Sequence, residues 1–121
     1  MTWEVRLHAD FHDELLRLDA PIRIAIFASI TVLESVGPQL GRPYADTLKG
    51  SKYPNMKELR VTVPDGEWRV AFAFDPRRTA ILLVGGNKVG MSQTVFYRRL
   101  IVDADRRYGE HLAGLRKGLT E

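Results

Sequence analysis

The sequence contains no cysteine. A disulfide framework, a thiolate metal site and a cysteine nucleophile are therefore excluded, and the chain suits a reducing compartment. The N-terminus carries acidic residues and lacks the basic start and apolar run of a signal peptide. The longest apolar stretches, residues 22–36 and 80–84, are broken by Arg23, Glu34 and small residues, so we expect no membrane span and a cytoplasmic location.

The length of 121 residues predicts a single domain over residues 1–121 with one hydrophobic core. The last nine residues, 113–121, are expected to form a frayed tail. The net charge of +3 is unevenly distributed, because residues 1–41 carry three basic and six acidic side chains whereas residues 42–88 carry nine and five. The middle segment is the part expected to face an anion such as a phosphodiester backbone, although an ordinary solvated surface gives the same count.

Hydrophobic periodicity predicts seven elements in the order β-α-α-β-β-β-α. They fall at residues 3–7, 8–18, 21–36, 58–63, 68–74, 79–84 and 94–112. Residues 39–57 hold two Gly and two Pro without periodicity and are expected to form an extended loop. The fold class predicted is α+β, with a twisted, mainly antiparallel sheet packed by helices.

The turn between the first two strands of the predicted meander sets which side chains meet. If Val63 pairs with Trp68 across a turn at residues 64–67, then Arg60 lies diagonal to Arg69 on the face that carries Glu58. Arginine side chains at this spacing can reach one another over the small residues of the neighbouring strand. The register therefore predicts two converging guanidinium groups.

The third strand returns toward the end of the sheet where Arg69 begins, and it should bring Lys88 to the same place. A concave basic patch of Arg60, Arg69 and Lys88 is the candidate site. Such a patch suits phosphoryl transfer, because guanidinium and ammonium groups stabilise the charge of a pentacovalent phosphate without a metal. Arginines that merely pair with acids on a solvated sheet face are the structural alternative.

Histidines are absent from the predicted meander, which argues against a two-histidine nuclease. His8 and His12 have the i, i+4 spacing of metal ligands but lack a placed third ligand, so we expect surface residues and no metal or cofactor. Nucleotide binding is not indicated, because the glycines before Lys88 lack the spacing and the following hydroxyl of a phosphate-binding loop.

Four short motifs follow one another in a familiar order: LKG at 48–50, KELR at 57–60, WRVAFAFD at 68–75 and GGNK at 85–88. Together they resemble the HigB branch of the RelE/ParE toxin superfamily, including its phage-derived relatives. The resemblance covers nearly the whole chain. It implies a ribosome-dependent endoribonuclease that cleaves messenger RNA by attack of the ribose 2′-hydroxyl on the adjacent phosphate and so inhibits translation.

Carried onto this sequence, the resemblance implies that Arg60 and Arg69 bind and polarise the phosphate and that Lys88 neutralises the developing charge. Lys57 is expected to be a fourth member of the site. The remaining RNA-binding candidates, on or before the first meander strand, are Lys49, Lys52, Tyr53 and Glu58. The general base stays open between Glu58 and a tyrosine, since the histidine and aspartate of some relatives have no counterpart at matching positions here.

The resemblance also implies a partner, usually a helix-turn-helix antitoxin through which the complex contacts DNA. An exposed sheet edge or apolar helix ridges would be its docking surface. Two alternatives remain: a ParE-like gyrase inhibitor with the same fold, and a remnant that binds RNA or antitoxin without cutting. The codon preference, the antitoxin and the oligomeric state are not predicted.

Overall fold

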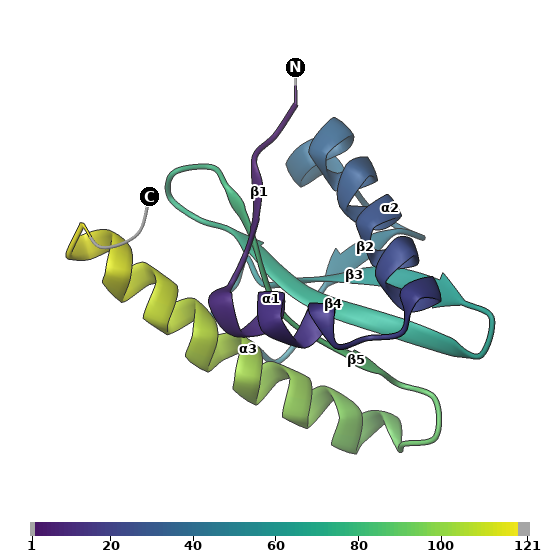
Figure 1. Cartoon of the computed structure of the whole chain (residues 1–121). Coiled ribbons are helices and arrows are strands. Elements are labelled where there is room, and N and C mark those ends of the chain that lie inside the picture. The colour runs from purple at the N-terminus through teal and green to yellow at the C-terminus, as the bar shows by residue number, and fades with distance from the viewer. Residues whose placement is uncertain (1, 119–121) are drawn as a thin grey trace.

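A computed structural model describes residues 2–118 as an α+β fold in which one mixed sheet separates two helical layers (Figure 1). The elements are β1 (Val5–Leu7), α1 (Ala9–Leu16), α2 (Ala20–Val36), the 3-10 turn η1 (Gly37–Gln39), β2 (Ala45–Thr47), β3 (Lys57–Val63), β4 (Gly66–Phe74), β5 (Ala80–Asn87) and α3 (Gln93–Arg116). The strand order is β1-β5-β4-β3-β2, and only the β1–β5 pair is parallel among the described strands. The predicted fold class is confirmed.

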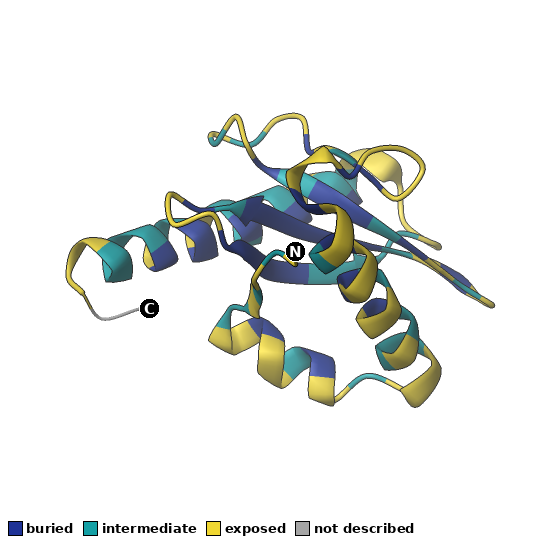
Figure 2. Ribbon diagram, turned by 90° about the horizontal axis from the view of Figure 1, so that it is seen from above, coloured by how far each residue is buried: buried dark blue, intermediate teal, exposed yellow. Residues whose placement is uncertain are grey.

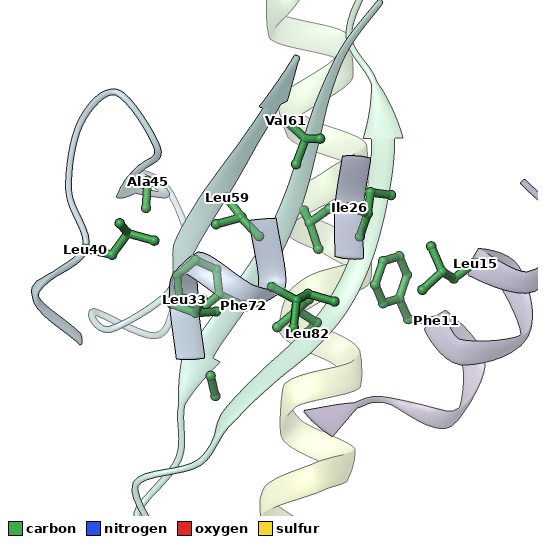
Figure 3. Close-up of a cluster of buried hydrophobic side chains, with 13 residues drawn as sticks. Phe11, Leu15, Ile26, Leu33, Leu40, Ala45, Leu59, Val61, Phe72 and Leu82 are labelled. Carbon is green, nitrogen blue, oxygen red and sulfur yellow. The ribbon is translucent and has the colours of Figure 1, made fainter. Parts of the chain in front are cut away.

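Each face of the sheet has its own apolar core. On one face Leu59, Val70 and Phe72 pack against α1 and α2, with Ile26 and Leu33 supplied by α2 (Figure 3). On the other face Ala71, Ala73 and Leu83 pack against the side of α3 that carries Phe96, Leu100, Ala104 and Tyr108. Figure 2 shows the buried strands between the two helical layers. Because side chains alternate along a strand, the sequence parity of a meander residue decides which layer it faces.

The helices begin and end where local signals place them. The Ser92 hydroxyl caps α3 by accepting the backbone N–H of Val95 at 3.2 Å. Pro21 lies in the first turn of α2, and Gly37 follows its last residue with φ 73°, a conformation that favours glycine. A Cβ at Gly37 would lie 2.3 Å from the indole Nε1 of Trp3, so a side chain there is excluded by space as well as by conformation.

Several boundaries differ from the sequence-based expectation, and three of the differences affect the description of the sheet and of α3. The predicted loop 39–57 contains the short edge strand β2, which pairs with residues 57–59 of β3 and was missed because three residues show no periodicity. β5 continues through Gly85 and Gly86 to Asn87. α3 continues to Arg116, so the part of the predicted tail from 113 to 116 is helical. Residues 119–121 of that tail lie outside the described part.

The register of the β3–β4 hairpin is shifted by two residues from the prediction. Val63 pairs with Gly66 across a two-residue turn, and Arg60 lies directly opposite Arg69, not diagonal to it. Two-residue turns are the commonest hairpin connections. Gly66 is needed in the strand because a Cβ there would lie 2.7 Å from the Asn87 side chain. Each side chain still lies on the face of the sheet that was predicted for it, because side chains alternate along a strand and a shift of two residues does not change the face.

The segment Ala20–Gln39 is long and apolar enough to cross a membrane by length and composition, with a mean hydropathy of 1.5. This corrects the expectation that Arg23 and Glu34 exclude such a span, although one helix of this kind is weak evidence. The inward side of α2 is committed to the core through Ile26, Ile30 and Leu33.

Candidate functional site

A hollow of about 430 Å³ opens between the edge of the sheet at β2 and β3 and the start of α3. Its lining residues come from these three elements and from the segment that follows β2: Asp46, Thr47, Leu48, Lys49, Glu58, Arg60, Gln93, Thr94 and Tyr97. Cationic, anionic and hydroxyl groups thus share one concave surface. The first turn of α3 contributes to the wall, and its backbone N–H groups favour an anion.

Glu58 is the centre of the polar network and is 4% exposed. Its Oε1 accepts the Tyr97 hydroxyl at 2.7 Å, and its Oε2 accepts the Arg60 guanidinium at 3.0 and 3.2 Å. The Nε of Arg69 lies 3.8 Å from Oε1. A buried carboxylate is stable in such a place only when opposite charges and donors surround it, as they do here.

Arg60 is about one-third exposed and presents its guanidinium to the hollow. The hydrogen bonds that Arg60 donates to Glu58 raise the pKa of Arg60, with Asp46 adding to the effect. Asp46 lies 3.3 Å from Arg60 and accepts a bond from Arg42 at 2.9 Å. The backbone N–H of Thr47 and the Arg42 side chain lower the pKa of Asp46, so this carboxylate stays ionised beside Arg60.

Arg69 is buried, at 7% exposure, behind the hollow. It faces Arg60 across the strand pair, donates to the Trp68 carbonyl at 3.1 Å and lies 3.8 Å from Glu67. It does not line the hollow, and its Nε is buried without a hydrogen-bond partner. Arg60 and Arg69 lie side by side, as predicted, but of the two only Arg60 lines the hollow and can contact a ligand in it.

Tyr97 is one of the lining residues that the sequence did not single out for the site. Its hydroxyl reaches Glu58 from the second turn of α3. Burial and the hydrogen bond to Glu58 raise the pKa of Tyr97 above its usual value of 10.0. The phenol therefore keeps its proton at neutral pH. Tyr97 follows Phe96, which is buried in the core, so its place beside the buried side of α3 was the one indication in the sequence that its side chain lies near the sheet.

The remaining predicted residues separate into two groups. Lys49 lines the hollow. Lys88 follows β5, where its backbone N–H donates to the Glu67 carbonyl at 3.0 Å, so it lies beyond Arg69 and outside the lining. The predicted patch of Arg60, Arg69 and Lys88 is thus a row across three strands and not one concave site.

Lys52, Tyr53 and Lys57 lie away from the hollow. The Tyr53 ring packs edge-on against Tyr108 with centroids 4.9 Å apart, and Lys52 covers that ring at 5.3 Å. Lys57 has the opposite parity to Glu58 and donates to the Pro38 carbonyl at 2.9 Å on the other side of the sheet. The prediction that Lys57 is a fourth member of the site is therefore wrong, because its side chain lies on the opposite face of the sheet.

The histidines lie together elsewhere. His8, His12 and His111 line a second hollow of about 720 Å³ between α1 and α3. His8, Asp10 and Glu110 hold ligand atoms within 4.8 Å of one another. The Nδ1 of His8 accepts the Asp10 backbone N–H at 3.1 Å, which leaves its other nitrogen to face Glu110 at 3.2 Å. His8 therefore serves as the N-cap of α1, and this role explains why His8, Asp10 and Glu110 lie close together.

A mixed five-stranded sheet in the order β1-β5-β4-β3-β2 with helices on both faces matches solved structures of the RelE type. The structure is similar to E. coli toxin RelE, solved as a double arginine mutant in the free state, with a TM-score of 0.60 and 11% identity over 84% of this chain and 96% of that one. It is also similar to a chain of the archaeal RelE-RelB complex from Pyrococcus horikoshii OT3, with a TM-score of 0.55 and 16% identity over 74% and 99%.

The family model described as Phage derived protein Gp49-like matches residues 13–109. The chain belongs to this family and is HigB-like. It is 48% identical to "Putative toxin HigB2" of Mycobacterium tuberculosis over 79% of its own length, and 46% identical to "Putative toxin HigB3" of the same organism over 74%. The matches span 48% of the first relative and 75% of the second, so the chain covers about half the length of HigB2.

Proposed function

We propose that this chain is the toxin of a toxin–antitoxin pair and acts in the cytoplasm as a ribosome-dependent endoribonuclease that cleaves messenger RNA. The observation that carries the proposal is the Arg60 guanidinium on the wall of the hollow, held in place by Glu58 and accompanied by Lys49. The Nε and Nη2 of Arg60 are held by Glu58 and Asp46, and the rest of the guanidinium, with a second cation and a helix N-terminus, is suited to a phosphodiester. The names of the HigB relatives and the RelE-type fold support the same class.

In the proposed reaction the 2′-oxygen forms a bond to the adjacent phosphorus while the bond from phosphorus to the 5′-oxygen breaks. Arg60 and Lys49 stabilise the extra negative charge on the phosphate oxygens. Arg69 adds positive potential from behind Arg60. Lys88, beyond Arg69, is proposed to contact a neighbouring phosphate of an extended messenger.

Tyr97 and Glu58 are proposed to supply the general base together. The hydroxyl of Tyr97 accepts the proton of the 2′-hydroxyl and passes its own proton to Glu58 Oε1, 2.7 Å away. The departing 5′-oxygen takes a proton from solvent in the open hollow.

The proposed partner is a helix-turn-helix antitoxin, through which alone the complex contacts DNA. A solved complex of a RelE with a RelB shares the fold of this chain, which supports a protein partner. The RNA-binding roles of Lys52, Tyr53 and Lys57 stay predictions, and their positions limit them to contacts remote from the hollow.

Primer extension on a reporter messenger tests the activity. The chain, Arg60→Ala and the control Arg98→Ala, an exposed arginine of α3 away from the hollow, are each induced in cells with and without a translation inhibitor. We expect translation-dependent cuts with the wild type and Arg98→Ala and none with Arg60→Ala. Growth arrest with an intact messenger would refute the nuclease and point to a gyrase inhibitor.

A further inference from the structure

Asp46 and Glu58 hold the same arginine from two neighbouring strands. The two residues lie directly opposite each other in the β2–β3 pair, a register in which two carboxylates repel. Arg60 lies between them, with its Nη2 3.0 Å from Glu58 Oε2 and 3.3 Å from Asp46 Oδ2. The guanidinium therefore relieves the repulsion and shares its positive charge between two anions.

The edges of the Arg60 guanidinium are unequally occupied. Glu58 Oε2 takes the edge formed by Nε and Nη2, at 3.2 and 3.0 Å. Asp46 Oδ2 accepts the other proton of Nη2, which belongs to the edge formed by Nη1 and Nη2. Nη1 makes no hydrogen bond within residues 2–118 and is not shut off from solvent. Since a phosphate is held best by two parallel N–H groups, only half of the second edge is free for it.

The two carboxylates differ in their freedom to release Arg60. Glu58 is buried, and a carboxylate at that depth needs its cationic partner. The Asp46 side chain is 26% exposed and belongs to the three-residue edge strand β2. It also accepts hydrogen bonds from the Thr47 backbone N–H and from Arg42, both at 2.9 Å. Asp46 can therefore leave Arg60 and keep its other partners, whereas Glu58 cannot leave without a large cost.

The surroundings of this contact favour an incoming anion. Lys49 and the first turn of α3 line the same hollow as Arg60 and Asp46. A phosphate drawn there by these groups competes with Asp46 for the Nη1–Nη2 edge. Arg42 is 74% exposed and lies on the far side of Asp46 from Arg60, so the displaced carboxylate still has a cation.

We propose that Asp46 is a positioning residue that occupies half of the free edge of Arg60 until a phosphate of the messenger displaces it, and that Arg42 then retains Asp46. The identity of the ligand rests on the proposed function. Asp46 lowers the affinity of the hollow for substrate and product alike and does not touch the reacting atoms. Removing its charge therefore tightens RNA binding, whereas replacing a residue that merely supports Arg60 would weaken binding.

Fluorescence anisotropy tests this sign. The probe is a fluorescein-labelled RNA octanucleotide whose 2′-hydroxyls are methylated, so that it cannot be cleaved. We expect Asp46→Asn to bind it about fivefold more tightly than the wild type at low salt. The control is Asp65→Asn, which removes an exposed acid from the β3–β4 turn outside the hollow and should change binding by less than about twofold. Circular dichroism melting curves establish that each variant is folded.

Cleavage on purified ribosomes gives a second readout. With Asp46→Asn the half-saturating toxin concentration should fall by a similar factor, while the maximal single-turnover rate stays unchanged. This split is expected because substrate and transition state gain the same contact with Arg60. A fall in the maximal rate without tighter binding would show that Asp46 only supports the site, and it would overturn the inference.

A double-mutant cycle tests the role of Arg42. Arg42→Gln should weaken binding of the octanucleotide about threefold, because Asp46 then loses its alternative partner and stays on Arg60. The same substitution in the Asp46→Asn background should have no effect. An equal loss in both backgrounds would make Arg42 a direct RNA contact and overturn its part in the inference.

The outcomes separate this inference from the proposed function. Equal or weaker binding by folded Asp46→Asn would overturn the inference, whereas primer extension with Arg60→Ala would still judge the nuclease. Absence of binding by both wild type and Asp46→Asn would show that loss of the carboxylate does not open Arg60 to a phosphate, which also overturns it. Tighter binding by Asp46→Asn without any cleavage in cells would support Asp46 as the competitor for Arg60 and refute the nuclease.

Discussion

Arg60 and Arg69 lie directly opposite each other on β3 and β4, and Glu58 contacts both guanidinium groups from the adjacent position on the same face. Two like charges in cross-strand register are unfavourable without a counter-charge. The buried carboxylate therefore does two things at once: it makes the arginine pair tolerable, and it fixes the direction in which Arg60 points. Stability and the proposed function meet in this one side chain.

Glu58→Gln should destabilise the fold by about 3 kcal/mol, because it removes the buried charge that two partly desolvated guanidinium groups share and leaves them only Asp46 and Glu67. The loss is measured as the change in the free energy of unfolding in urea. Glu67→Gln is the matched control, since Glu67 is half exposed and lies 3.8 Å from Arg69. The control should change stability by less than about 0.5 kcal/mol. Equal effects of the two substitutions would contradict the central role of Glu58.

Tyr97→Phe keeps the ring and removes only the hydroxyl that donates to Glu58. We expect a stability loss of about 1 kcal/mol. Messenger cleavage should fall by about 10² or more if the hydroxyl relays the proton. Single-turnover cleavage of messenger on purified ribosomes measures the rate. A folded variant that cleaves at the wild-type rate would remove Tyr97 from the reaction.

The raised pKa of Tyr97 has a consequence for alkaline stability. The folded-state pKa lies above the unfolded value of 10.0, so below pH 10 the phenol is neutral in both states, and its contribution to stability is fully present and does not change with pH. As the pH rises from the unfolded value toward the folded one, the unfolded chain loses this proton first and stability declines. The tyrosinate absorbance of the wild type minus that of Tyr97→Phe should have its midpoint above pH 10. A midpoint at or below 10 would show that burial and Glu58 do not hold this proton.

Arg107 joins the two helical layers past the edge of the sheet. It binds Glu14 of α1 through two bonds of 2.8 and 2.6 Å and donates to the Leu83 carbonyl at 2.8 Å. The hydrogen bonds that Arg107 donates to Glu14 raise the pKa of Arg107. Because the Glu14 side chain is 43% exposed, Glu14→Gln should cost only about 2 kcal/mol. Asp103→Asn, which removes an exposed pair with Arg106, should cost less than about 0.5 kcal/mol in the same thermal melts.

Gly37→Ala should destabilise the fold by more than about 1 kcal/mol, because the positive φ is unfavourable for alanine and the new methyl group displaces the Trp3 indole. Gly41→Ala is the matched control, since its nearest neighbour would lie at 3.9 Å and its φ is outside the left-handed region. Denaturant titration of both variants separates this close approach from a general effect of replacing glycine. A neutral Gly37→Ala would contradict the packing of Trp3 against the end of α2.

The sequence predicted the order of elements and the face on which Glu58, Arg60 and Arg69 lie, because both depend on local periodicity and parity. It did not predict the pairing partner of Arg60, since the turn could absorb two residues without changing either face. β2 was missed because its three residues form a strand only through pairing with β3. Tyr97 was missed for a related reason: its neighbour Glu58 is 39 positions away in sequence, and only the packing of α3 on the sheet brings them together.

The order of the strands constrains when the hollow can form during synthesis of the chain. β1 is made first, but its partner β5 lies 75 residues later, with Val5 paired to Ala80. The wall of the hollow is completed later still by Gln93, Thr94 and Tyr97. A nascent chain therefore has no complete sheet and no site until most of it has left the ribosome. Contacts of such long range also slow folding, so under the proposed function a delay separates synthesis of the chain from the first cleavage of messenger RNA.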